Sequence, residues 1–249
     1  MGPLLSLGDG APVRGNGVAV THSPFLLIGD HAGHAIPAAL GTLGLGADDR
    51  MRHIALDLGI CELGLAVGEL LDAPFLWQHF SRLVCDCNRA PAAEDWAALV
   101  SDGTKIPGNI DLAPEARQQR EDEIFAPYHR AISAALDQRA SASVPTALIA
   151  LHSFTPRMRG QDRPWEIGIL HDGHEDALAR RVLQRLRAVP GLIVGDNEPY
   201  MMDGTDYTVP RHAFARRLPY VEFEVRQDCL ADRAGIARMA NLIVDVLKQ

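Results

Sequence analysis

The chain has 249 residues, 47% of them hydrophobic, and its 24 basic and 32 acidic side chains give a net charge of −8. This length can bury a large core, whereas the negative charge argues against a general nucleic-acid binder, which would concentrate Lys and Arg. No apolar run approaches the roughly 20 residues of a membrane helix, and the first residues lack the basic start and apolar core of a signal peptide, so we expect a cytoplasmic protein.

Strand and helix patterns alternate along the chain after a start that is rich in Gly and Pro. Residues 1–17 show no period, and we interpret them as a flexible segment before a single domain over residues 18–249. Apolar runs and helical spacing then predict, in order, a strand at 25–28, a helix at 48–71, a strand at 75–87 and a helix at 114–139. A strand at 146–151, a strand at 167–170, a helix at 174–188, strands at 192–194 and 220–225, and a helix at 231–247 follow.

This alternation is typical of an α/β fold with three layers. We expect a mixed, mostly parallel sheet with helices on both of its faces. Pro127 should kink or divide the helix at 114–139, because proline removes a backbone donor and clashes with the preceding turn.

Polar side chains follow the ends of two predicted strands, which is where ligands bind in open α/β sheets. The first strand is followed by Asp30 and His31, and the third is followed by His152. Two histidines at one edge of a sheet could bind a metal ion together, but a catalytic zinc ion usually has a third protein ligand.

Asp57 is the preferred candidate for that third ligand. We expect it in the first third of an apolar helix, at the edge of the buried face, where a carboxylate is costly unless a cation or a hydrogen bond meets it. The alternative is a carboxylate that is stabilised by the helix dipole, or by an ion pair with Arg52 or His53. His34 is the alternative ligand if Asp57 points away.

The run from residue 81 to residue 89 is polar on one face if it is a strand. Arg82, Asp86 and Asn88 then share that face, and Arg89 follows them. Such a face suits anion recognition, because the arginine fork binds a carboxylate through two hydrogen bonds. The alternative is an ion pair between Arg82 and Asp86 that supports an edge strand.

The last predicted strand also alternates. Glu222, Glu224 and Arg226 share one face, and Glu224 stands nearer to the end of the strand. At this position a glutamate could take a proton from a metal-activated water molecule and pass it to a leaving nitrogen. The alternative is a salt bridge between strands on an exposed face.

Four segments in chain order resemble the N-formylglutamate amidohydrolase family. They are Asp30-His31-Ala32-Gly33 with Ile36-Pro37, the run from Ser81 to Arg89, Leu151-His152-Ser153, and Glu224-x-Arg226-Gln227-Asp228. The resemblance extends over about residues 22–230. The family is similar in fold to zinc carboxypeptidases and to zinc N-acetylmuramoyl-L-alanine amidases, which implies a phosphorylase/hydrolase-like fold with a zinc site.

The resemblance also implies roles for individual residues. It implies His31, Asp57 and His152 as ligands of one divalent metal ion, with zinc expected, and Glu224 as the general base. It implies Asn88 and Arg89 as the pair that holds the substrate's α-carboxylate, and Tyr207 and His212 as residues of a loop near the active site. Arg82 and Arg226 are further candidates for substrate binding.

We therefore expect metal-dependent hydrolysis of the amide bond of a small N-acyl amino acid that resembles N-formylglutamate. A peptidase or a cell-wall peptide amidase on the same scaffold is the first alternative, although the missing export signal argues against the cell-wall enzyme. The second alternative is a non-catalytic homologue that binds a carboxylate or a metal. Neither a nucleic acid nor a membrane is expected as a partner, and the oligomeric state is left open.

Overall fold

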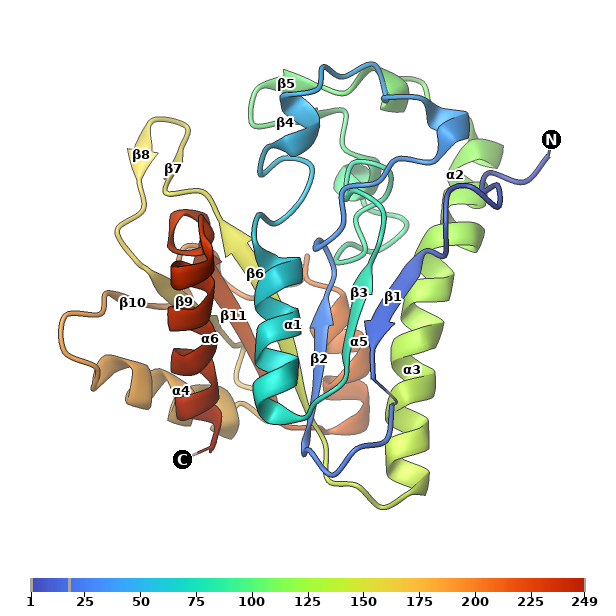
Figure 1. Ribbon diagram of the computed structural model, residues 1–249. Helices are drawn as coiled ribbons and strands as arrows, with labels where there is room; N and C mark the ends of the chain where they lie inside the picture. Colours follow the sequence, from blue (N-terminus) through green and yellow to red (C-terminus); the bar gives the residue numbers. More distant parts are fainter. Residues whose placement is uncertain (1, 18, 249) are drawn as a thin grey trace.

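A mixed sheet of seven strands forms the centre of the molecule in the computed structural model, which describes residues 2–17 and 19–248. Across the sheet the strands are β1 (Val13–Asn16), β3 (Phe75–Gln78), β2 (Phe25–Gly29), β6 (Ala147–Phe154), β11 (Tyr220–Arg226), β9 (Ile167–Leu170) and β10 (Val194–Asp196). The four strands from β3 to β11 run parallel, whereas β1 and β9 are antiparallel to their inner neighbours (Figure 1). The sheet is therefore mixed and mostly parallel, as predicted.

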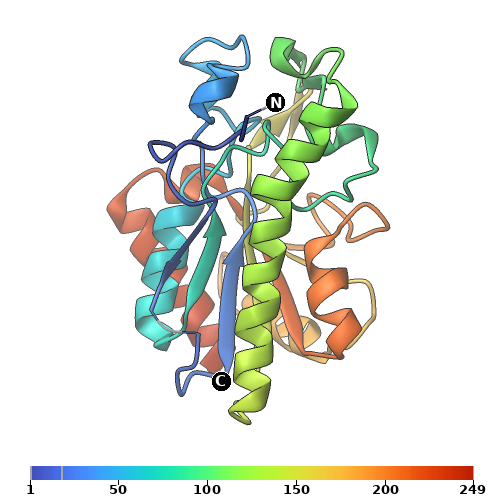
Figure 2. The same cartoon turned by 90° about the vertical axis from the view of Figure 1, so that its right-hand side faces the viewer.

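Helices cover both faces of the sheet. One face carries α1 (Ile60–Leu71), α4 (Ala177–Arg187) and α6 (Arg233–Lys248), and the other carries α3 (Ala126–Ser141) and the short α5 (Thr208–His212). Figure 2 shows these layers with α1 and α6 on the left, the sheet in the middle, and α3 and α5 on the right. None of the described helices is long and apolar enough to cross a bilayer.

Smaller elements lie in the connections. Two hairpins pair β4 (Val100–Ser101) with β5 (Thr104–Lys105) and β7 (Arg157–Met158) with β8 (Gln161–Asp162). Short 3₁₀ helices cover Ala38–Leu40, Asp49–Met51, Glu94–Ala97, Pro107–Asn109, Phe214–Arg216 and Gln227–Leu230.

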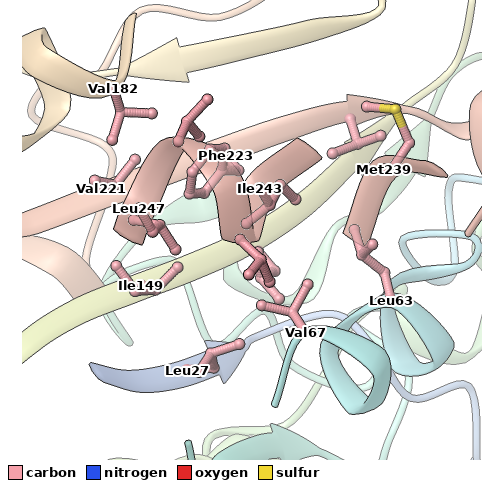
Figure 3. Packing of buried hydrophobic residues seen from close by; sticks show 14 of the residues in the cluster. Leu27, Leu63, Val67, Ile149, Val182, Val221, Phe223, Met239, Ile243 and Leu247 are labelled. Carbon is pink, nitrogen blue, oxygen red and sulfur yellow. The ribbon is translucent and has the colours of Figure 1, made fainter. Parts of the chain in front are cut away.

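The strands alternate between two buried clusters. Leu27, Ile149 and Phe223 point to the side of α1 and α6, where they belong to the cluster that includes Leu63 and Ile243 (Figure 3). The intervening residues point to the opposite face. This alternation places His152, Glu222 and Glu224 on the α3 and α5 side of the sheet.

The predicted helix at 48–71 is shorter than expected. The α-helix begins only at Ile60, because the preceding Gly59 has a left-handed backbone (φ = 80°) that a helix does not contain. A side chain could not replace this glycine easily, since a Cβ atom there would lie 2.5 Å from Cβ of Leu230. Asp57 therefore lies in a loop before α1, and its predicted place on the helix is wrong.

The predicted strand at 75–87 ends at Gln78, so the strand alternation expected for residues 81–89 is also wrong. Side chains in this run hydrogen bond to nearby backbone and form turns instead. Oγ of Ser81 accepts from N of Leu83 at 3.2 Å, and Oδ1 of Asp86 accepts from N of Asn88 at 2.8 Å. Such local bonds compete with the hydrogen-bond ladder of a sheet.

Two further differences concern the bounds of strands. Residues 13–16 form β1 although the sequence shows no period there. Strand β6 extends to Phe154, because β11 pairs with it over its whole length, so His152 lies inside a strand rather than in a loop. The sequence predicts a kink or a division at Pro127; in the structure the helix runs on past it, and a π-helical segment (Glu121–Phe125) lies just before it, between α2 (Pro114–Arg120) and α3.

Candidate active site

Two histidines and an aspartate converge at the carboxyl ends of β2 and β6. Oδ2 of Asp57 lies 2.9 Å from Nδ1 of His152 and 3.5 Å from Nδ1 of His31. The three side chains offer ligand atoms that all lie within 4.8 Å of one another, and all three residues are buried. Imidazole nitrogens and a carboxylate oxygen are donors that zinc and related divalent ions accept in proteins.

Backbone contacts hold the loop of Asp57 against both strands. N of Asp57 donates to the carbonyl oxygen of His31 at 2.9 Å. Oγ of Ser153, next to His152 in β6, donates to the carbonyl oxygen of Leu58 at 2.9 Å. The aspartate thus reaches the histidines from a loop that is tied to each of their strands.

Each histidine also faces a carboxylate on its other ring nitrogen. Nε2 of His31 lies 2.7 Å from Oδ1 of Asp86, and Nε2 of His152 lies 3.4 Å from Oδ2 of Asp30. The contact between His31 and Asp86 is a hydrogen bond, and metal-binding histidines commonly donate their second N–H to a carboxylate in this way, which fixes the ring orientation. Nε2 of His152 makes no hydrogen bond within the described residues.

A further observation supports a metal ion bound by these three side chains. Nδ1 of His31 is buried and has no hydrogen-bond partner among the described residues. A buried polar atom of this kind is costly unless it meets a ligand. Asp57 faces it across 3.5 Å, so a cation between them would satisfy both groups.

Arg82 contacts both Asp57, the candidate metal ligand, and Asp86, the carboxylate partner of His31. Its Nε and Nη2 atoms donate to Oδ2 of Asp86 at 3.1 and 2.6 Å, and Nη1 lies 3.5 Å from Oδ1 of Asp57. Burial opposes the charge on Asp86, but Arg82 and His31 outweigh it and hold the pKa of Asp86 well below its ordinary value. The ion pair between Arg82 and Asp86, which was the alternative interpretation of residues 81–89, is therefore present, but the two residues do not lie in a strand.

Glu224 lies beside His152 because the register of β11 and β6 pairs these two residues. Its Oε2 atom is buried without a hydrogen-bond partner in the described part of the chain. Burial raises the pKa of Glu224 to about 7 and that of the neighbouring Glu222 to about 8. A carboxyl group with such a pKa can both accept and donate a proton near neutral pH.

A cavity of about 480 Å³ opens above these side chains. Seven of the residues predicted for the site line it: His31, Asp57, Arg82, Asn88, Arg89, His152 and Glu224. Glu222, which the sequence placed on the same face as Glu224, lines it as well.

Asn88 and Arg89 both line the cavity, but they have different hydrogen-bond partners. Oδ1 of Asn88 accepts from the backbone N of Tyr207 and of Thr208, at 3.0 and 2.9 Å, and so holds the start of α5. Nε of Arg89 lies 3.0 Å from Oδ2 of Asp95, and Nη1 donates to the carbonyl oxygens of Asn88 and Thr205 at 2.9 and 3.3 Å. The Arg89 side chain is 21% exposed and lines the cavity.

Other predicted residues do not line the cavity. The phenol of Tyr207 accepts a hydrogen bond from Arg211, and its ring packs against His129. His212 is fully buried beside the same His129, and Arg226 pairs with Asp228. His34 is exposed and lies outside the group of candidate metal ligands.

Sequence reasoning placed Tyr200 in the segment that resembles the family's loop near the active site but selected Tyr207 from it, and it missed the partners of the histidines. Tyr200 is the tyrosine of that segment that lines the cavity, and a local pattern cannot tell which of two tyrosines faces inward. Asp30 and Asp86 stood beside candidate residues in the sequence, but their pairing with histidines joins distant segments. No pattern in the local sequence indicates these pairings.

Comparisons with known proteins agree with this architecture. A crystal structure of a gene product of Agrobacterium tumefaciens superposes with a TM-score of 0.94 at 32% identity, over 98% of this chain and 96% of that one. The N-formylglutamate amidohydrolase of Ralstonia eutropha superposes with a TM-score of 0.68 at 21% identity, over 96% of each chain, and is similar in fold. No curated protein sequence matches the chain.

The sequence profile described as N-formylglutamate amidohydrolase matches residues 23–231, a range that contains all the side chains of the cavity discussed above. This match covers most of the chain, and its range includes β2, β6 and β11, which carry or precede the clustered residues. The chain belongs to the N-formylglutamate amidohydrolase family.

Proposed function

We propose that the protein is a metal-dependent amidohydrolase that cleaves the amide bond of a small N-acyl amino acid, with N-formylglutamate as the reference substrate. One observation carries the proposal: a free, buried carboxylate oxygen of Glu224 shares a cavity with the group of His31, Asp57 and His152. Family membership supports hydrolysis of an amide bond.

The residues that would hold the metal ion are His31 and His152, through Nδ1, and Asp57, through Oδ2. Zinc is the expected ion, because nitrogen and carboxylate donors in a set of three are typical of catalytic zinc. When bound, such an ion acts as a Lewis acid toward a carbonyl group and makes water more acidic.

Glu224 is the proposed general base. It takes a proton from the attacking water molecule as the water oxygen bonds to the carbonyl carbon of the substrate. It then delivers that proton to the nitrogen as the carbon–nitrogen bond breaks, which releases the acyl group as a carboxylic acid and the amino acid as an amine. A pKa of about 7 suits both transfers, and burial is its first cause.

Arg89 is the proposed anchor for the α-carboxylate of the substrate, because it lines the cavity and arginine binds carboxylates through two hydrogen bonds. Asn88 supports it by fixing the loop before α5, whose Asp206 lies 3.7 Å from the Arg89 guanidinium. Arg82 holds Asp86 and Asp57 in place.

Metal analysis combined with a hydrolysis screen tests the proposal. The purified protein should contain about one divalent ion per chain and should hydrolyse N-formyl or N-acetyl amino acids. A chelator should abolish turnover, and added zinc should restore it. Turnover that survives complete metal removal would refute the proposal, and so would hydrolysis of dipeptides alone, which would favour a peptidase.

Glu224→Gln is the matched control, since it leaves the three ligand side chains intact. It should bind the metal as the wild type does and hydrolyse none of the substrates at a comparable rate. Full activity in this variant would remove Glu224 from the mechanism.

A further inference from the structure

Several large apolar side chains that face solvent gather at the cavity. Val100 in β4 and Tyr200 and Met201 in the loop between β10 and α5 all line it, although they are 55%, 40% and 67% exposed. Met158 of β7, which is partly buried, lines it as well. Exposed apolar residues that lie apart are ordinary on a soluble protein, whereas several around one cavity indicate a surface that binds a ligand. We call these four residues the apolar rim.

The side chains of the apolar rim are not part of the core that folds the chain. None of the four belongs to either of the two buried clusters of the described residues. Their apolar surface therefore stays in contact with water until a ligand covers it. Covering it with an apolar group is favourable, because binding then removes apolar surface of both partners from water.

Contacts with Arg163 hold Tyr200 and Met158 in place. Oη of Tyr200 accepts a hydrogen bond from Nη1 of Arg163 at 2.9 Å and lies 4.0 Å from Sδ of Met158. The Arg163 guanidinium also donates to that sulfur at 3.0 Å, and it lies over the Tyr200 ring, 4.7 Å from its centroid. Arg163 follows the β7–β8 hairpin, which itself directly follows β6, the strand of His152. This part of the apolar rim therefore has a defined place relative to a candidate metal ligand.

Val100 joins the apolar rim from a separate hairpin, β4–β5. Figure 1 shows both hairpins beyond the carboxyl end of β6. The tip of β4–β5 is held by Asp102, whose Oδ2 lies 3.2 Å from Nε2 of His53 and 3.6 Å from Nη2 of Arg52. The neighbouring Leu99 is exposed to a similar extent, 53%, but only Val100 lines the cavity.

The cavity is larger than the reference substrate requires. Its volume is about 480 Å³, and cavities of roughly 300–1,000 Å³ hold drug-sized molecules. N-formylglutamate is far smaller than such a molecule, and its formyl group carries only a hydrogen atom where other acyl groups carry a carbon chain. The cavity therefore has room for a larger acyl group.

The contacts of Arg89 indicate which end of the substrate reaches the apolar rim. Arg89 pairs with Asp95 and donates to the carbonyl oxygen of Thr205, whereas Tyr200 contacts Met158. Neither a hydrogen bond nor an ion pair joins these two groups in the part of the chain that the structure describes, so they form separate parts of the wall. With the α-carboxylate of the substrate at Arg89, the group on the far side of the scissile carbonyl extends toward the apolar rim. That group is the acyl chain.

We propose that the apolar rim binds an aliphatic acyl group of the substrate, so that the enzyme prefers amino acids with a butanoyl or hexanoyl group over those with an acetyl group. The inference rests on the proposed function and names the acyl part of its substrate. The acyl chain packs against Val100, Tyr200 and Met201, while Arg89 binds the α-carboxylate. Hydrolysis then releases the aliphatic carboxylic acid and the free amino acid.

A series of N-acyl-L-glutamates with acetyl, butanoyl and hexanoyl groups tests the inference. These alkyl amides have similar intrinsic reactivity, so differences in kcat/KM report how well the acyl chain is bound in the transition state. Full burial of a methylene group favours binding about fourfold, and a rim that stays partly open to water should give about twofold. From acetyl to hexanoyl, kcat/KM of the wild type should therefore rise on the order of tenfold. A series that is flat or falls with chain length would overturn the inference.

Met201→Gln and Val100→Thr make the apolar rim more polar at nearly constant size. Each should lower the ratio of kcat/KM for the hexanoyl compound to that for the acetyl compound about two- to threefold. Ile193→Gln and Leu99→Thr are the matched controls, because both residues are about as exposed as Val100 and lie outside the lining of the cavity. The controls should keep the wild-type ratio. A wild-type ratio in both rim variants would overturn the inference, and so would a change in preference among amino-acid side chains alone.

Failure of the inference and failure of the proposed function give different results. If N-formyl-L-glutamate is hydrolysed but a longer acyl chain does not raise kcat/KM, only the inference is overturned. If the wild type with metal bound hydrolyses neither N-formyl-L-glutamate nor any member of the series, the proposed function itself is overturned.

Discussion

The buried pair of His129 and His212 should make the fold sensitive to acid. Nδ1 of His129 lies 2.9 Å from Nε2 of His212, and the outer nitrogens meet the carbonyl oxygen of Cys87 and Oγ of Ser133 at 3.0 and 3.5 Å. These contacts are all satisfied when both rings are neutral, with His129 donating to Cys87 and His212 donating to His129. Burial lowers the pKa of His129 to about 4, and burial together with the proximity of His129 lowers that of His212 to about 3.

The sign of the effect follows from comparing the two states. Above the ordinary pKa of 6.5, both histidines are neutral in the folded and in the unfolded chain, so they contribute no pH dependence. As the pH falls from about 6.5 to about 4, the two histidines bind protons in the unfolded chain but not in the folded chain, so the free energy of unfolding decreases. At about pH 5, each histidine should lower the free energy of unfolding by about 2 kcal/mol. That is a large share of the roughly 5–15 kcal/mol of a typical domain.

Urea unfolding at about pH 7.5 and about pH 5 is compared between the wild type and His212→Gln, because Glu222 and Glu224, with pKa values of about 8 and 7, titrate alike in both proteins and cancel in the difference. Glutamine keeps an N–H group for Nδ1 of His129 but cannot titrate, so the pH-dependent loss should shrink by about 2 kcal/mol. His34→Gln serves as the control, because His34 is exposed. Equal pH dependence in the wild type and in His212→Gln would refute the assignment of the acid sensitivity to this pair.

The remaining predictions concern the proposed active site. His31→Ala and His152→Ala should each lose the metal ion and activity while the protein stays folded, and Asp57→Asn should weaken metal affinity, because an amide lacks the charge that holds a cation. Glu224→Gln should keep the metal ion and bind substrate, but kcat should fall about 10²–10⁴-fold. Arg89→Ala should raise KM at least as much as it lowers kcat, and it should erase the preference for a free α-carboxylate over the corresponding amide.

Three measurements check these outcomes. Metal content by elemental analysis, with circular dichroism as the folding control, tests the ligand variants, and stoichiometric metal in either His31→Ala or His152→Ala would remove that residue from the ligand set. Steady-state kinetics test Glu224→Gln, for which a normal kcat would contradict the assigned role. A substrate preference that survives in Arg89→Ala would transfer the anchor to Arg82, which also lines the cavity.

The spacing of apolar residues and the composition were sufficient to predict the architecture of the fold. Apolar runs such as Phe25–Ile28 and Ile167–Leu170 lie in strands buried on both faces, which only a covered sheet provides. Alternation along β11 put Glu222 and Glu224 on one face before any pairing was known, because neighbouring residues of a strand point to opposite sides. His31 and His152 followed from a different argument, their places at the ends of two predicted strands.

Local pattern failed where tertiary contacts determine the backbone. The alternation of residues 81–89 imitates a strand, yet this segment turns back so that Asp86 can pair with His31, 55 residues earlier in the chain. Asp57 was correctly chosen as a neighbour of the histidines but was placed on a helix, because helical spacing does not register the left-handed Gly59.

Contacts between distant segments also decide which side chains share the cavity. His152 meets Asp57 across 95 residues, and the amide of Asn88 meets the start of α5 across about 120. Each of these residues is polar and sits near a predicted strand end or turn, which the sequence reveals. Which polar residue meets which depends on sheet order and on the register of β6 against β11. A one-residue shift of that register would turn Glu224 away from His152, and only packing of the two buried faces fixes it.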